Sequence, residues 1–149
     1  MKYQRVAVLG SNSFAGAAFV ARALKYGATV IGFNRSAEAS SIFLPYKNSN
    51  DISSYNFIKA DVNNDLNLII KEIDFFRPQV IVDFAGQGMV AESWSAPEQW
   101  YTTNIVAKVR LHDHLRKREW LERFVRISTP EVYGSQSHVL RENWTYNPS

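Results

Sequence analysis

The sequence of 149 residues contains no cysteine and no apolar run long enough to cross a membrane. The first absence excludes disulfides, thiolate metal sites and a cysteine nucleophile, and it fits a reducing compartment. The five N-terminal residues lead straight into a strand pattern, which leaves no room for a signal peptide. We therefore expect a cytoplasmic protein with no membrane partner.

Strong charge is also absent, because the net charge is only +3 and the basic residues are scattered. The exception is the run of three basic residues at 116–118, near the end of a predicted helix, where cations favour the helix dipole. No aromatic residues alternate with them, so a solvated helix end is expected rather than a nucleic-acid surface. An apolar content of 46% is that of an ordinary folded domain.

Strand and helix patterns alternate along the whole chain. The predicted strands are Arg5–Leu9, Thr29–Phe33, Asn56–Ala60, Val80–Ala85 and Arg123–Ser128. The predicted helices are Phe14–Tyr26, Asp65–Phe76 and Pro97–Lys117, with loops over 36–55 and 86–95 and an irregular tail from Gly134. This alternation predicts an α/β fold, one doubly wound parallel sheet of order 3-2-1-4-5 over residues 1–149. Ligands of such sheets bind beyond the carboxyl ends of the strands.

The turn after the first predicted strand has the composition of a phosphate-binding loop. A glycine allows the tight turn, small polar residues let backbone N–H groups approach a diphosphate, and a second glycine brings the helix close to the strand. The residues are Gly10, Ser11, Asn12, Ser13, Phe14 and Gly16. Ser13 stands where a dinucleotide-binding motif usually has its middle glycine. A plain strand–turn–helix without a ligand is therefore the alternative.

The second and third predicted strands end in residues that suit an adenosine group. Asn34, Arg35 and Ser36 offer an arginine but no carboxylate, which favours NADP over NAD because a guanidinium can bind a 2′-phosphate. The alternative is a solvated arginine in a turn. Asp61, followed by Val62, either accepts a hydrogen bond from an adenine amino group or caps the next helix.

The fourth predicted strand ends in Phe84, Ala85, Gly86 and Gln87, which would lie under the nicotinamide half of a dinucleotide. Asp83 interrupts the apolar run and needs partners, but its role stays unassigned. Asn104 faces inward on the long predicted helix. Its amide either bonds the backbone of the fifth strand or lies near the nicotinamide ribose.

The same helix carries His112 and His114. Their spacing puts them on different faces, so they cannot share a metal and are expected at the surface. No metal site is expected.

The fifth predicted strand ends in Ser128, Thr129, Pro130 and Glu131. A hydroxyl there can hydrogen-bond a substrate alcohol, and a carboxylate can move a proton beside a new carbonyl. The alternative is a strand-end turn with a solvated glutamate.

These segments resemble, in order, the NAD-dependent epimerase/dehydratase family, the extended short-chain dehydrogenase/reductases. The segments are residues 10–16, residues 83–87, Ser93-Trp94 with Asn104, and residues 128–134. The resemblance implies a Rossmann fold, an NAD(P) cofactor and a nucleotide-sugar substrate that is transiently oxidised at C4. Residues 128–134 are most similar to the nucleotide-sugar 4,6-dehydratases. There the threonine matching Thr129 binds the hexose 4-hydroxyl, and the carboxylate matching Glu131 removes the C5 proton.

The sequence departs from the family pattern at two places. Pro130 stands where the dTDP-glucose enzymes have an aspartic acid, so elimination needs another acid and epimerisation stays open. The family's tyrosine and lysine, four residues apart, do not follow the segment 128–134. We therefore expect an N-terminal part of a longer family fold, without turnover by itself. A non-catalytic dinucleotide-binding module or sensor is the alternative.

The missing later strands would leave the fifth strand at an open edge. Because exposed apolar edges pair with other chains, we expect self-association.

Overall fold

The computed structural model describes residues 3–135, 137, 139–142 and 145–148. Its strands are β1 (Arg5–Leu9), β2 (Thr29–Asn34), β3 (Tyr55–Lys59), β4 (Val80–Asp83) and β5 (Arg123–Arg126). Its α-helices are α1 (Phe14–Lys25), α2 (Leu66–Phe76), α3 (Val90–Ser95), α4 (Pro97–Tyr101) and α5 (Ala107–Leu115). A π-helical turn (Thr102–Val106) joins α4 to α5. Short 3-10 turns occupy Pro45–Asn48, Ile52–Ser54 and Pro130–Tyr133.

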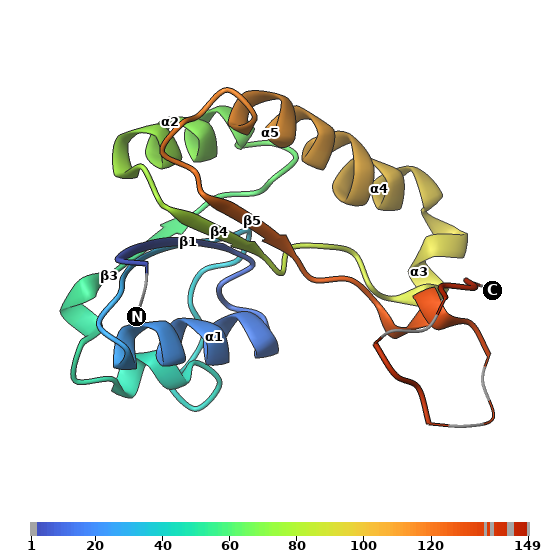
Figure 1. Cartoon of the computed structure of the whole chain (residues 1–149), viewed down its shortest axis with the longest axis horizontal. Helices are drawn as coiled ribbons and strands as arrows, with labels where there is room; N and C mark the ends of the chain where they lie inside the picture. Colours follow the sequence, from blue (N-terminus) through green and yellow to red (C-terminus); the bar gives the residue numbers. More distant parts are fainter. Residues whose placement is uncertain (1–2, 136, 138, 143–144, 149) are drawn as a thin grey trace.

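All strand pairs are parallel and the order is β3-β2-β1-β4-β5, which confirms the predicted fold and topology. Figure 1 shows the sheet between two helical layers, with α1 on one face and α2 and α5 on the other. Alternate residues of β1 serve these two faces. Val6 and Val8 belong to the apolar cluster on the α1 side, whereas Ala7 and Leu9 belong to the cluster on the α2–α5 side. This double burial explains the unbroken apolar run of the strand.

The first helix ends as predicted, within one residue. Gly27 has a φ of 79°, and its N–H bonds the carbonyl of Leu24 at 2.8 Å. The N–H of Ala28 bonds the carbonyl of Ala23 at 3.1 Å. Together these two bonds close the C-terminal turn of α1.

Two predicted elements were wrong in part. The predicted loop 86–95 contains α3, a helix without a buried residue, so it has no apolar period that a sequence could show. The predicted helix Pro97–Lys117 is broken by the π turn and ends at Leu115. Strands β4 and β5 also end two residues early. The Asp83 carboxylate accepts the N–H of Ala85 at 3.0 Å and turns the chain out of the sheet.

Strand β5 lies at one edge of the described sheet, and Val125 in it is 37% exposed. The self-association expected from such an edge stays a prediction. In the part of the chain that the structure describes, no helix is both long and apolar enough to cross a membrane.

Candidate functional site

The turn between β1 and α1 is held tightly against the neighbouring strands. The N–H groups of Gly10 and Ser11 both donate to the carbonyl of Phe33 at the end of β2, at 2.8 and 3.1 Å. Gly10 has a φ of 76°, and a Cβ there would lie 2.8 Å from the backbone nitrogen of Ala85 and 2.9 Å from the carbonyl carbon of Phe84. The close approach of β1 to the end of β4 therefore requires glycine at this position.

Ser13 takes a capping role at the position where the middle glycine was missing. Its Oγ accepts the N–H of Gly16 at 3.1 Å and donates to the carbonyl of Gly10 at 2.8 Å. A Cβ on Gly16 would collide with that carbonyl oxygen. Among the described residues no acceptor faces the N–H groups of Phe14 and Ala15, which open α1. This helix end therefore keeps two donors and a positive dipole for an anion.

Asn12 joins this turn to the loop that follows β2. Its side-chain N–H groups bond the carbonyls of Ser36 and Ala37 at 3.3 and 3.2 Å. Its carbonyl oxygen is 2.9 Å from the hydroxyl of Tyr46, which also lies 2.9 Å from a carboxylate oxygen of Glu38. Tyr46 is fully buried, and this burial raises the pKa of its hydroxyl. Asn12 and Ser36 thus fix the geometry of the loop.

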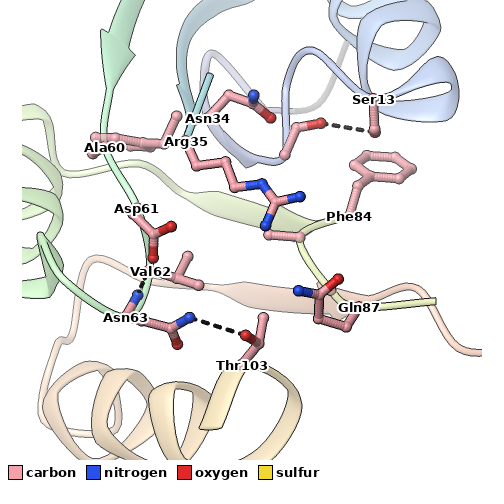
Figure 2. A pocket seen from close by; sticks show the side chains of 14 residues that line it. Ser13, Asn34, Arg35, Ala60, Asp61, Val62, Asn63, Phe84, Gln87 and Thr103 are labelled. Carbon is pink, nitrogen blue, oxygen red and sulfur yellow. Dashed lines mark hydrogen bonds between the residues drawn. The ribbon is translucent and has the colours of Figure 1, made fainter. Parts of the chain in front are cut away.

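One cleft at the carboxyl ends of β1 to β4 brings most of the predicted site together (Figure 2). Ten predicted residues line it: Gly10, Ser13, Asn34, Arg35, Asp61, Val62, Phe84, Ala85, Gly86 and Gln87. Four lining residues were not predicted: Phe33, Ala60, Asn63 and Thr103. Seven predicted cofactor residues do not line it: Ser11, Asn12, Phe14, Gly16, Ser36, Asn104 and Ser128.

The side chains at the ends of β2 and β3 line one end of this cleft. Figure 2 shows the guanidinium of Arg35 pointing into it, between Asn34 and Phe84. The Asp61 carboxylate accepts the N–H of Asn63 at 2.7 Å and so shapes the turn after β3. The predicted capping of the next helix by Asp61 was wrong, because the residue at the start of α2 is Asp65.

Two neighbouring side chains of the π turn, Thr103 and Asn104, contact two different loops. Thr103 is buried and its hydroxyl accepts a hydrogen bond from the Asn63 amide at 2.9 Å. The Asn104 amide pairs with the backbone N–H and carbonyl of Gln87, at 3.0 and 2.9 Å. The suggested partner in the fifth strand was therefore wrong, whereas the position near the nicotinamide ribose stays a prediction, and the part-buried amide has its partners as required. Because the π turn is wider than an α-helical turn, the consecutive residues Thr103 and Asn104 bond loops on both sides of the cleft.

Asp83 belongs to a buried cluster of charges. Its side chain is 0% exposed and lies 3.0 Å from the ammonium of Lys108 and 2.6 Å from the guanidinium of Arg126. The Lys108 side chain is only 6% exposed. Lys108 was not predicted as a site residue, although its spacing in the sequence indicates a buried lysine. It follows Asn104 by four residues and precedes Leu111 by three, on the inward face of the helix, where lysine is uncommon.

The two histidines differ. His112 is exposed and its ring stands edge-on to Phe124, with the ring centroids 4.4 Å apart. The expected surface position of His114 was wrong. It is half-buried beside the Asp74 carboxylate, at 3.0 Å, in a cluster with Arg118 that joins α2 to α5.

A sequence model of the NAD dependent epimerase/dehydratase family matches residues 6–149. The chain belongs to this family. It is 27% identical over 153 residues to the dTDP-glucose 4,6-dehydratase of Xanthomonas campestris pv. campestris, a match that covers 95% of this chain and 43% of that protein. The chain thus spans less than half the length of this curated relative.

Solved structures share the same fold. The UDP-Glc/GlcNAc 4-epimerase of Campylobacter jejuni superposes with a TM-score of 0.81 at 19% identity, over 98% of this chain and 44% of that one. The dTDP-glucose 4,6-dehydratase of Bacillus anthracis, in complex with NAD, gives 0.76 at 26% identity over 98% and 44%. The cleft of this family member fits a dinucleotide, because it lies beside a helix N-terminus with free donors, Gly10 in its turn carries no side chain, and Arg35 brings a positive charge to one end.

The residues predicted to do chemistry lie outside this cleft. Thr129 and Glu131 are both exposed, on either side of Pro130 in the 3-10 turn after β5. Ser128 precedes them and is exposed as well. The structure therefore groups ten of the predicted cofactor residues in one cleft but does not bring Thr129 and Glu131 to them.

Proposed function

We propose that this chain binds NAD(P) in the cleft and serves as the cofactor-binding part of a nucleotide-sugar epimerase or 4,6-dehydratase that acts by transient oxidation at C4. The observation that carries the proposal is the convergence of the four strand ends on one cleft beside the N-terminus of α1. Bound there, the dinucleotide would supply a hydride acceptor. The names of the similar proteins, dehydratases and epimerases of nucleotide sugars, support the substrate class.

Each part of the cleft suits one part of the dinucleotide. The N–H groups of Phe14 and Ala15 would receive the diphosphate, since they lack protein acceptors among the described residues. Asp61 and its neighbours at the end of β3 would receive the adenine. The nicotinamide half would lie over Gly86 and Gln87, which line the other end of the cleft.

Direct titration tests this proposal. We expect NADH to bind the purified chain, with enhanced nicotinamide fluorescence, and Val62→Trp to weaken binding by at least about tenfold because the indole fills the cleft. Val109→Trp is the matched control, since Val109 is 63% exposed on α5 and does not line the cleft. Equal affinities for the two variants would contradict the assignment of the cleft.

Arg35 supports a preference for NADP. Its guanidinium points into the cleft, and no carboxylate stands at the end of β2 to repel a 2′-phosphate. We expect Arg35→Ala to weaken NADP binding about tenfold, the value of one charge-assisted hydrogen bond, and to leave NAD nearly unchanged. Arg110→Ala, at an exposed position of α5 outside the cleft, controls for the loss of one positive charge. Tighter binding of NAD than of NADP by the unmodified chain would refute the preference.

We further propose that Thr129 holds the sugar hydroxyl and that Glu131 moves the proton beside the carbonyl. Pro130 between them has no proton to donate, so elimination of water would need another acid. The exposed positions of Thr129 and Glu131 favour a second candidate, a binding module without catalysis. Titration of dTDP-glucose and UDP-glucose into the NADH-loaded chain separates the two. Binding that Thr129→Ala weakens supports the first, and no binding of either nucleotide sugar supports the second.

A further inference from the structure

The cluster of Asp83, Lys108 and Arg126 carries two positive charges and one negative charge. The Lys108 ammonium lies 3.0 Å from both carboxylate oxygens of Asp83, and one nitrogen of the Arg126 guanidinium lies 2.6 Å from the second of them. With all three groups ionised, the cluster keeps one net positive charge. A buried ion pair is costly to form, so a lysine retained here in place of an apolar residue needs a reason.

The cluster lies directly beneath one end of the cleft. The Asp83 carboxylate also accepts the N–H of Ala85 at 3.0 Å, and Ala85 lines the cleft. A Cβ built on Gly86 would come within 4.0 Å of the second guanidinium nitrogen of Arg126. The excess positive charge therefore stands next to the wall formed by Ala85 and Gly86.

We propose that the net positive charge of Asp83, Lys108 and Arg126 makes this cleft bind the reduced dinucleotide more tightly than the oxidised one. The inference rests on the proposed function, because it takes the nicotinamide half to lie over Gly86. The oxidised nicotinamide ring carries a positive charge and the reduced ring is neutral, whereas the two phosphates are the same in both forms. A fixed positive charge beside the ring therefore disfavours only the oxidised form.

The expected size follows from one unit charge acting within a Debye length in a partly dry site. Removing it changes the ratio of the two dissociation constants, oxidised over reduced, by roughly fivefold. For a two-electron couple that ratio corresponds to a shift of about 20 mV in the potential of the bound cofactor. A cleft of this kind would favour withdrawal of a hydride from the sugar.

The pH dependence gives a second signature. Burial lowers the pKa of the Lys108 ammonium, partly offset by the facing Asp83 carboxylate and reinforced by Arg126. The ammonium is charged below its pKa in the folded chain and neutral above it. The preference for the reduced form should therefore be full at pH values below that pKa and fall as the pH rises through it, because the cluster then becomes neutral.

The test is the ratio of dissociation constants for NAD⁺ and NADH, and for NADP⁺ and NADPH, measured on the whole chain by calorimetry and fluorescence. We expect Lys108→Met to lower the ratio about fivefold at a pH where Lys108 is charged, and Lys108→Arg, which keeps the charge, to leave the ratio unchanged and to remove its decline with rising pH. Lys71→Met, at an exposed position of α2, is the control for surface charge. Arg126→Met provides an independent route to a neutral cluster, since its side chain is 34% exposed and tolerates replacement more readily.

Ratios that stay at the wild-type value in both Lys108→Met and Arg126→Met would overturn the inference, as would parallel weakening of both cofactor forms, which a purely structural role predicts. If Lys108→Met does not fold, Arg126→Met alone decides. Failure of the unmodified chain to bind any of the four dinucleotides would instead defeat the proposed function, and this inference with it. Normal binding with an unchanged ratio defeats only this inference.

Discussion

Replacing Gly10 with alanine tests the geometry on which the cleft depends. A residue with a side chain in the left-handed region costs about 1–2 kcal/mol, of which the stiffer unfolded chain returns about 0.5–1 kcal/mol. At Gly10 the added methyl would also meet the backbone of Ala85 at 2.8 Å and of Phe84 at 2.9 Å. Because backbone atoms cannot rotate away, this overpacking adds about 1–3 kcal/mol. We expect Gly10→Ala to lower the free energy of unfolding by about 3 kcal/mol in total.

Gly27 provides the matched control for backbone strain alone. Its φ of 79° equals that of Gly10 within 3°, but a Cβ there has open space around it. We expect Gly27→Ala to cost only about 1 kcal/mol. Gly88, which also has open space and no positive φ, should tolerate alanine with a change within about 0.5 kcal/mol.

Urea denaturation of the three variants, followed by circular dichroism, gives the comparison. If Gly10→Ala and Gly27→Ala destabilise the chain equally, the close approach of β1 to the end of β4 contributes nothing and the reasoning fails. Gly10→Ala should also weaken NADH binding more than Gly27→Ala, because only the first shifts the turn before α1 against the cleft.

Four further substitutions, at three residues, test local interactions by the same denaturation assay. Ser13→Ala should cost about 1 kcal/mol, because the N–H of Gly16 loses its cap. Ser13→Gly should cost only about a few tenths of a kcal/mol. Hydrogen bonds from Arg118 hold the pKa of the Asp74 carboxyl below its usual value, so this pair stabilises the fold above pH 4 and is lost as the pH falls through the lowered pKa. Asp74→Asn should therefore cost about 0.5–1 kcal/mol at pH 7, and this cost should decrease as the pH falls through the lowered pKa; a cost that does not decrease in acid would contradict this. Tyr46→Phe should cost about 1 kcal/mol, because the part-buried oxygens of Asn12 and Glu38 lose the one hydroxyl proton that they share.

The sequence was sufficient to predict the fold because the three central strands, β1, β2 and β4, have two buried faces. Val6, Ala7, Val8 and Leu9 must all be apolar, and such runs, separated by helix patterns, leave few topologies other than the one observed. Helix α3 has no buried residue, so its sequence shows no apolar periodicity and the helix was not predicted.

The part of the candidate site that lies at the strand ends could also be predicted from the sequence. Residues that follow a strand directly, such as Gly10, Arg35 and Phe84, lie where the parallel sheet must place them, and all three line the cleft. Thr103 could not be predicted, because the π turn that rotates it toward Asn63 arises from packing of the helix between two loops.

By itself, the sequence determined the order of the strands, the glycine-dependent turn before α1 and the edge of the sheet at which a dinucleotide would bind, because these follow from local periodicity and from the direction of parallel strands. Only the tertiary structure decided that Asp83, Lys108 and Arg126 share one buried cluster. These residues are up to 43 positions apart, and a salt bridge between them has no periodicity that the sequence could reveal. Their meeting depends on the register of β4 with β5 and on the way α5 packs across both strands.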